Sequence, residues 1–107
     1  MTIANYDFRS LYSHFDLQKK SLIGDLVITD TNILEGAPAC LIRYYELDGR
    51  WEIFSNEETN MLNMRVCCLS DIISGKTDER SIMQNMTSNQ KAIRKPNGHW
   101  IICDFTP

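Results

Sequence analysis

Hydrophobic and polar positions near the start of the chain follow the spacing of an amphipathic helix. Four apolar residues recur at i, i+3, i+4 and i+7 and would form one stripe: Phe8, Leu11, Tyr12 and Phe15. With Asn5 as its cap, we expect this helix to run from residue 5 to about residue 20 and to cover one face of a sheet.

After this stripe the pattern changes to that of strands and turns. Leu26, Val27 and Ile28 predict a first strand over residues 24–29, because adjacent β-branched residues favour extended backbone. Residues 30–38 contain asparagine, glycine and proline, which are typical of turns, so we expect a loop there.

The strongest signal is a hairpin over residues 40–55, where two β-rich runs flank Asp48 and Gly49. An Asp-Gly pair favours a two-residue turn. Such a turn predicts these cross-strand pairs: Leu47 with Arg50, Glu46 with Trp51, Tyr45 with Glu52, Tyr44 with Ile53 and Arg43 with Phe54.

Strand alternation divides this hairpin into two faces. The core face is expected to hold Cys40, Ile42, Tyr44, Trp51 and Ile53, with Glu46 at its rim. The other face mixes charge with large apolar groups: Leu41, Arg43, Tyr45, Leu47, Arg50, Glu52 and Phe54. Its aromatic and arginine residues have the composition of interface hot spots. Alternatively, a second layer of the fold covers this face and buries its large apolar groups, and residues 61–90 are the candidate for that layer.

The second half of the chain is less regular. Residues 61–75 fit a helix ending at Gly75, or a strand over about 63–69 followed by a helical turn over 70–74, and the β-leaning composition favours the strand. Residues 77–88 fit a short helix or an edge strand. Residues 91–95 and 99–105 flank Pro96, Asn97 and Gly98 and predict a second hairpin. Its last strand is apolar on both sides, so we expect it inside the sheet.

These elements predict one α+β domain over residues 1–107, with the N-terminal helix packed on a mostly antiparallel, twisted sheet of about five to six strands. The chain has 107 residues, which suits a single domain. The sequence contains no apolar run of 18 residues, so we expect no membrane span.

The net charge of the chain and its distribution indicate which classes of partner are favoured. The formal net charge is −3, so the chain lacks the electrostatic drive for direct nucleic-acid binding. Residues 1–60 carry 10 acidic and 5 basic side chains, and residues 61–107 carry 4 and 6. Acid concentrates around the first hairpin, at Glu46, Asp48, Glu52, Glu57 and Glu58. Such a patch can steer a basic partner, and it also fits a solvated face that keeps the protein soluble.

Residue patterns for catalysis or metal binding are weak. His14 and His99 are the two histidines, and neither neighbours a cysteine in a recognisable motif. The paired acids at 57–58 and 78–79 fit solvated turns better than a general acid and base. Phosphate loops and Cys-x-x-Cys pairs do not occur. We therefore expect a protein that is not an enzyme and that uses no catalytic residue, metal or cofactor.

The N-terminal residues lack a basic segment followed by an apolar one, so the sequence gives no sign of a signal peptide, and a cytoplasmic location is expected. The cysteines agree with a reducing compartment. Each lies in an apolar run, and we expect free, buried thiols at Cys40, Cys67, Cys68 and Cys103.

A short acidic domain without a catalytic motif resembles, in its whole-chain character, the bacterial toxin immunity proteins, including those of contact-dependent growth inhibition systems. That resemblance implies tight binding to a cognate toxin domain, often a basic nuclease, whose active site an acidic patch blocks. The partner-binding residues expected from the hairpin are Arg43, Tyr45, Glu46, Asp48, Arg50, Glu52, Phe54, Glu57 and Glu58. Two alternatives are a small regulatory adaptor of phage or plasmid type and a ligand-binding domain or enzyme with a pocket between helix 5–20 and the sheet.

Overall fold

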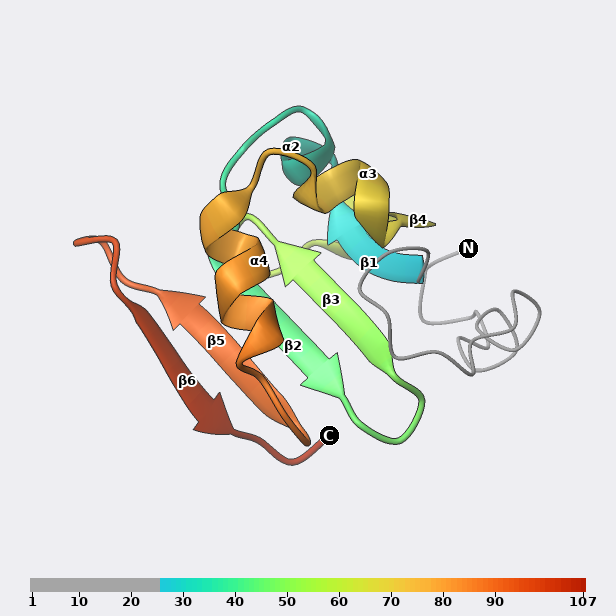
Figure 1. The fold of residues 1–107 in the computed structure, drawn as a ribbon. Coiled ribbons are helices and arrows are strands. Elements are labelled where there is room, and N and C mark those ends of the chain that lie inside the picture. Colours follow the sequence, from blue (N-terminus) through green and yellow to red (C-terminus); the bar gives the residue numbers. More distant parts are fainter. Residues whose placement is uncertain (1–25) are drawn as a thin grey trace.

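The computed structural model describes residues 26–107, which form a six-stranded, mostly antiparallel sheet with short helices (Figure 1). The strands are β1 (Leu26–Asp30), β2 (Leu41–Tyr45), β3 (Arg50–Phe54), β4 (Met64–Cys68), β5 (Gln90–Arg94) and β6 (Trp100–Asp104). Their order is β4-β1-β3-β2-β5-β6, and β1 and β3 are the parallel pair. The α+β class is confirmed. The helix expected over residues 5–20 lies outside the described residues.

The helices are α2 (Thr31–Leu34), the 3-10 turn η2 (Met61–Asn63), α3 (Leu69–Ile73) and α4 (Thr77–Gln84). The helices α3 and α4 lie on the same side of the sheet, and α4 crosses its middle strands (Figure 1). Their buried residues meet the expected apolar face of the first hairpin, including Ile42, Trp51 and Ile53. The prediction of which hairpin face is the core face is confirmed.

The opposite face of the sheet has its own smaller cluster. Ile28, Leu41 and Phe54 are buried there, with the half-buried Met64 and Val66 of β4 beside them. The helices α3 and α4 pack on the other side of the sheet, and β4 joins the sheet itself. The interpretation of residues 61–90 as a second layer over this face is therefore wrong.

The loop expected over residues 30–38 contains α2. Asp30 ends β1 and caps this helix, because its Oδ1 accepts the Ile33 N–H at 2.9 Å. Its other oxygen, Oδ2, accepts the N–H and the hydroxyl of Ser55, both at 2.8 Å. One carboxylate therefore fastens the ends of β1 and β3 to the helix, an arrangement that loop composition alone does not predict.

The second half of the chain follows the favoured alternatives. Residues 64–68 form β4 and residues 69–73 form α3, which confirms a strand followed by a short helix. Residues 77–84 are helical, and β5 and β6 form the expected second hairpin. The position of β6 was predicted wrongly. Among the described strands it pairs with β5 alone and forms an edge of the sheet, with Ile101 47% exposed.

The cysteines are free thiols, as expected, but the expectation that they are buried is wrong, because none of the four is fully buried. Cys40 and Cys67 are half-buried, whereas Cys68 and Cys103 are exposed. Within residues 26–107, no helix has both the length and the apolar character needed to cross a membrane.

Candidate functional site

The turn of the first hairpin is longer than its sequence predicts. Tyr45 pairs with Arg50, so residues 46–49 form a four-residue loop, and Gly49 occupies the left-handed region at φ 65°. Tyr44 therefore faces Trp51, and Arg43 faces Glu52, whereas the expected partners were Ile53 and Phe54. The expected register was wrong by two residues. A shift of two keeps every side chain on its face, which is why the faces were nevertheless correct.

This register places Glu52 among three partners on the face away from α3 and α4. Its Oε1 accepts a hydrogen bond from Arg43 Nε at 2.9 Å and another from the Tyr45 hydroxyl at 3.1 Å. Its Oε2 lies 3.7 Å from Arg50 Nε. Glu52 is 8% exposed, so two guanidinium groups and a phenol compensate a buried carboxylate.

Aromatic rings extend this cluster toward the end of the sheet. The Arg50 guanidinium carbon lies 3.8 Å from the centre of the Tyr45 ring, and that ring meets Phe105 edge-on at 5.2 Å. Burial raises the pKa of the Tyr45 hydroxyl, and the nearby Glu52 charge raises it further. The side chains beneath the hairpin tip are therefore held in place by neighbours on both strands.

We define the hairpin tip as Glu46, Leu47 and Asp48. Leu47 is 80% exposed, although leucine is apolar, and Glu46 is exposed beside it. The Glu46 N–H donates to Asn89 Oδ1 at 2.9 Å, which ties the tip to the start of β5. Asp48 Oδ2 lies 3.9 Å from Arg50 Nη1. The tip thus presents Leu47 and the exposed Glu46 side chain on a fastened loop, whereas the Asp48 side chain is 14% exposed and pairs with Arg50.

The nine expected binding residues do not form one patch. Glu46 and Asp48 lie at the hairpin tip, whereas Glu57 and Glu58 are exposed beyond the other end of β3. The five residues of β3 separate the two groups by about 16 Å, at roughly 3.3 Å per residue. Between them Glu52 is buried and ion-paired, and Phe54 is only 1% exposed. Arg43, Tyr45 and Arg50 are half-buried in the cluster beside Glu52.

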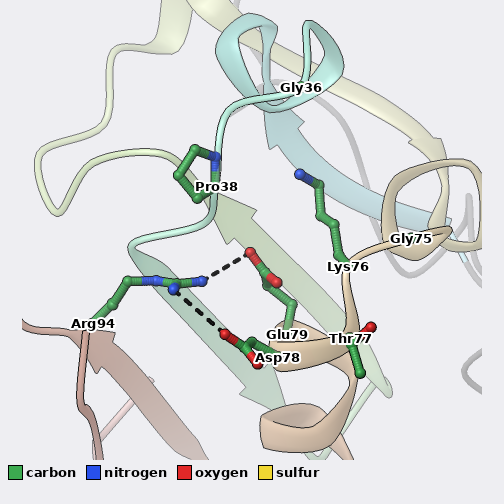
Figure 2. A pocket seen from close by; sticks show the side chains of 8 residues that line it. All are labelled: Gly36, Pro38, Gly75, Lys76, Thr77, Asp78, Glu79 and Arg94. Atoms are coloured by element: carbon green, nitrogen blue, oxygen red, sulfur yellow. Dashed lines mark hydrogen bonds and ion pairs between the residues drawn. The ribbon is translucent and has the colours of Figure 1, made fainter.

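A second group of charges lines an open hollow of about 390 Å³ where α4 begins (Figure 2). Glu79 is 4% exposed, and its Oε2 accepts the Ala39 N–H and Arg94 Nη2, each at 3.0 Å. Arg94 Nη1 lies 3.9 Å from Asp78 Oδ2, and Arg94 Nε donates to the Ala39 carbonyl. Lys76 Nζ donates to the Ala37 carbonyl at 2.9 Å.

These bonds fasten the segment before β2 to α4 and β5, so the charges of the hollow serve the fold. The interpretation of Glu79 as a solvated charge was wrong. A signal for its burial exists in the sequence, because Glu79, Met83 and Met86 recur at i, i+4 and i+7 and all three are buried. Asp78, its neighbour, is exposed as expected.

Among the described residues, no group of three or more histidine, cysteine, aspartate or glutamate side chains could hold a metal ion. His99 is exposed near the second hairpin turn, and His14 lies outside the described residues, as does the pocket expected beside helix 5–20. Burial raises the pKa of the Cys67 thiol to about 11, with Asp71 and Cys68 adding to the effect. A thiol with a raised pKa is a poor nucleophile at neutral pH.

Comparison with protein-family models, curated proteins and solved structures found no match to this chain.

Proposed function

We propose that the protein is a non-catalytic binding protein of the toxin-immunity kind, which acts in the cytoplasm and blocks a basic toxin domain with its hairpin tip. The observation that carries the proposal is Leu47, 80% exposed between Glu46 and Asp48. An exposed leucine can fill an apolar pocket of a partner, and the exposed Glu46 carboxylate beside it can pair with a basic group at the edge of that pocket.

The support beneath the tip favours tight binding. Association costs less when the contacting loop is already ordered, because less conformational entropy is lost. Glu46 is fastened to Asn89, and Arg50 is placed over Tyr45 and beside Glu52. The tip therefore requires little ordering when a partner binds.

The surroundings of the tip match a basic partner. Tyr44 pairs with Gln90, and Gln90 pairs with Asp104, so the end of β6 lies at the same end of the sheet as the tip. Asp104 is exposed there and adds a second exposed carboxylate to that of Glu46. A group of acids at one end of the sheet would accelerate encounter with a positively charged toxin domain at low salt.

Growth protection tests this proposal. The toxin domain encoded beside this chain's gene would be produced in a susceptible cell together with either the parent chain or a double variant at the tip, Glu46→Lys with Leu47→Asp. We expect the parent to protect and the tip variant to fail.

A matched control makes the same two chemical changes at the other end of the sheet, Glu57→Lys with Leu62→Asp. Both control positions are exposed, and Leu62 at 79% matches Leu47. Protection by the control but not by the tip variant supports the proposal. Equal protection by both variants would contradict it, and capture of a partner that is not a toxin domain would support a regulatory adaptor in its place.

A further inference from the structure

The last strand, β6, forms an edge of the sheet that no strand of residues 26–107 covers. It pairs with β5 alone, and in Figure 1 no described element lies beyond it. Its register runs without a bulge from Gln90–Asp104 to Arg94–Trp100. Natural edge strands usually carry a lysine, a proline or a bulge that prevents pairing with another strand. The centre of β6 is Ile101, Ile102 and Cys103, and it has none of these features.

The pairing pattern determines which main-chain groups of β6 point outward. The Lys95 N–H donates to the His99 carbonyl at 2.7 Å, and the Phe105 N–H donates to the Asn89 carbonyl at 3.0 Å. Hydrogen-bonded positions alternate along an antiparallel pair, so Ile101 and Cys103 also direct their main-chain groups toward β5. The N–H and C=O groups of Trp100, Ile102 and Asp104 therefore point away from the sheet.

The other edge of the sheet, β4, is guarded. Arg65 lies in this strand and is exposed, so a charge stands on the edge. Its Nη1 donates to the Leu62 carbonyl at 3.1 Å and to the Met64 carbonyl at 2.7 Å, where β4 begins. A second strand approaching there would have to displace the guanidinium group. The two edges thus differ, and β6 is the one open to pairing.

We propose that β6 pairs with β6 of a second copy of this chain, antiparallel and centred on Ile102, so that two sheets become one. This register pairs Trp100 with the second copy's Asp104 and Ile102 with its own counterpart. All three residues have outward main-chain groups, so about six hydrogen bonds form, two for each pair. The side chains are compatible with this register, because Ile101 of one copy then lies opposite Cys103 of the other copy. No like charges face each other across the pair.

Charge also favours the antiparallel arrangement. One end of the edge carries the exposed Lys95 and His99, and the other end carries the exposed Asp104. Antiparallel pairing places the basic end of one copy beside the acidic end of the other, whereas parallel pairing would bring like charges together. The strip is short compared with a standard interface of roughly 1,600 Å², so the dimer forms at high protein concentration and dissociates on dilution.

Sedimentation equilibrium tests the dimer itself. We expect the mass of the parent to rise with concentration from 12.4 kDa toward twice that value. Ile101→Lys adds an edge charge at an exposed position and should keep the mass at that of the monomer. Leu62→Lys makes the same change at another exposed position and should dimerise like the parent. A parent that stays monomeric at millimolar concentration, or an Ile101→Lys variant that dimerises like the parent, would overturn the proposal.

Cysteine crosslinking tests the register. Ile101→Cys would place a thiol opposite the second copy's Cys103, at a spacing that suits a disulfide. With oxidised glutathione as the oxidant, we expect a crosslinked dimer on a non-reducing gel from Ile101→Cys, and none when Cys103→Ser is added. Rapid crosslinking of the parent through Cys103 would overturn this register, because it requires the two Cys103 residues to face each other. Neither result depends on the proposed toxin partner.

Discussion

Arg43 and Glu52 lie directly opposite each other on β2 and β3, with Nε and Oε1 2.9 Å apart. Glu52 is buried, and its carboxylate also accepts the Tyr45 hydroxyl and lies beside Arg50. One carboxylate therefore balances two arginines under the hairpin tip. The order of this end of the sheet depends on that charge.

Replacing Glu52 should destabilise the protein. Glu52→Gln keeps the shape of the side chain but removes the carboxylate charge that Arg43 and Arg50 share, and we expect a loss of about 2 kcal/mol in the free energy of unfolding. This figure is below the usual cost for a fully buried pair because the Arg43 side chain keeps 28% of its exposure. Urea denaturation measures it. Glu57→Gln, at an exposed site, should change stability by less than about 0.5 kcal/mol, and equal losses in both variants would contradict the account.

Tyr45 should make stability depend on alkaline pH. Its pKa is raised above 10.0 in the folded protein, mainly by burial, so the folded state holds the proton more tightly than the unfolded state does. This contribution to stability is complete below pH 10 and is lost as pH rises from 10 toward the folded pKa. Tyr45→Phe should be less stable than the parent at pH 7, because a hydrogen bond to Glu52 is lost, yet its stability should fall less steeply above pH 10.

The titration of Cys67 also changes the stability of both proteins in this pH range. Its pKa rises from 9.0 to about 11, so stability also falls between pH 9 and 11 in both proteins. Denaturation curves at several pH values from 8 to 11 therefore separate the two groups, because the difference between parent and Tyr45→Phe contains the tyrosine alone. Parallel stability profiles for the two proteins above pH 10 would show that Tyr45 titrates normally.

The adjacent carboxylates at the start of α4 should behave differently. Glu79→Gln removes the buried charge that holds Arg94 and the Ala39 N–H, and we expect a loss of about 2 kcal/mol in the free energy of unfolding. Asp78→Asn, in the same helical turn, affects a side chain that is 76% exposed and should cost less than about 0.5 kcal/mol. Thermal or urea unfolding compares them, and a reversed order would refute the structural role of Glu79.

The sequence predicts those parts of the fold that depend on local pattern. Alternation separates Ile42 and Ile53 from Arg43 and Glu52, because alternation is a property of each strand alone. The register of the first hairpin depends on a tertiary contact, Glu46 with Asn89, which stabilises a four-residue loop where Asp48 and Gly49 predict a shorter one. The residues of the turn by themselves do not predict this hydrogen bond to Asn89, which lies far along the chain.

Burial of charge was the other property that local pattern could not predict. Glu52 and Glu79 are carboxylates, and composition places them at the surface. Each is buried because an arginine from another strand or helix reaches it, Arg43 in one case and Arg94 in the other. The edge position of β6 was missed for a related reason. An apolar strand predicts burial on both faces, but strand order decides which side remains open.

The proposed binding role of the hairpin tip is tested most directly by isothermal titration calorimetry with the toxin domain that the proposal expects a neighbouring gene to encode. Leu47→Asp should weaken binding at least about tenfold, which corresponds to roughly 1.4 kcal/mol, whereas Leu62→Asp, at an equally exposed leucine, should bind like the parent. Unchanged affinity of a folded Leu47→Asp variant would contradict the account.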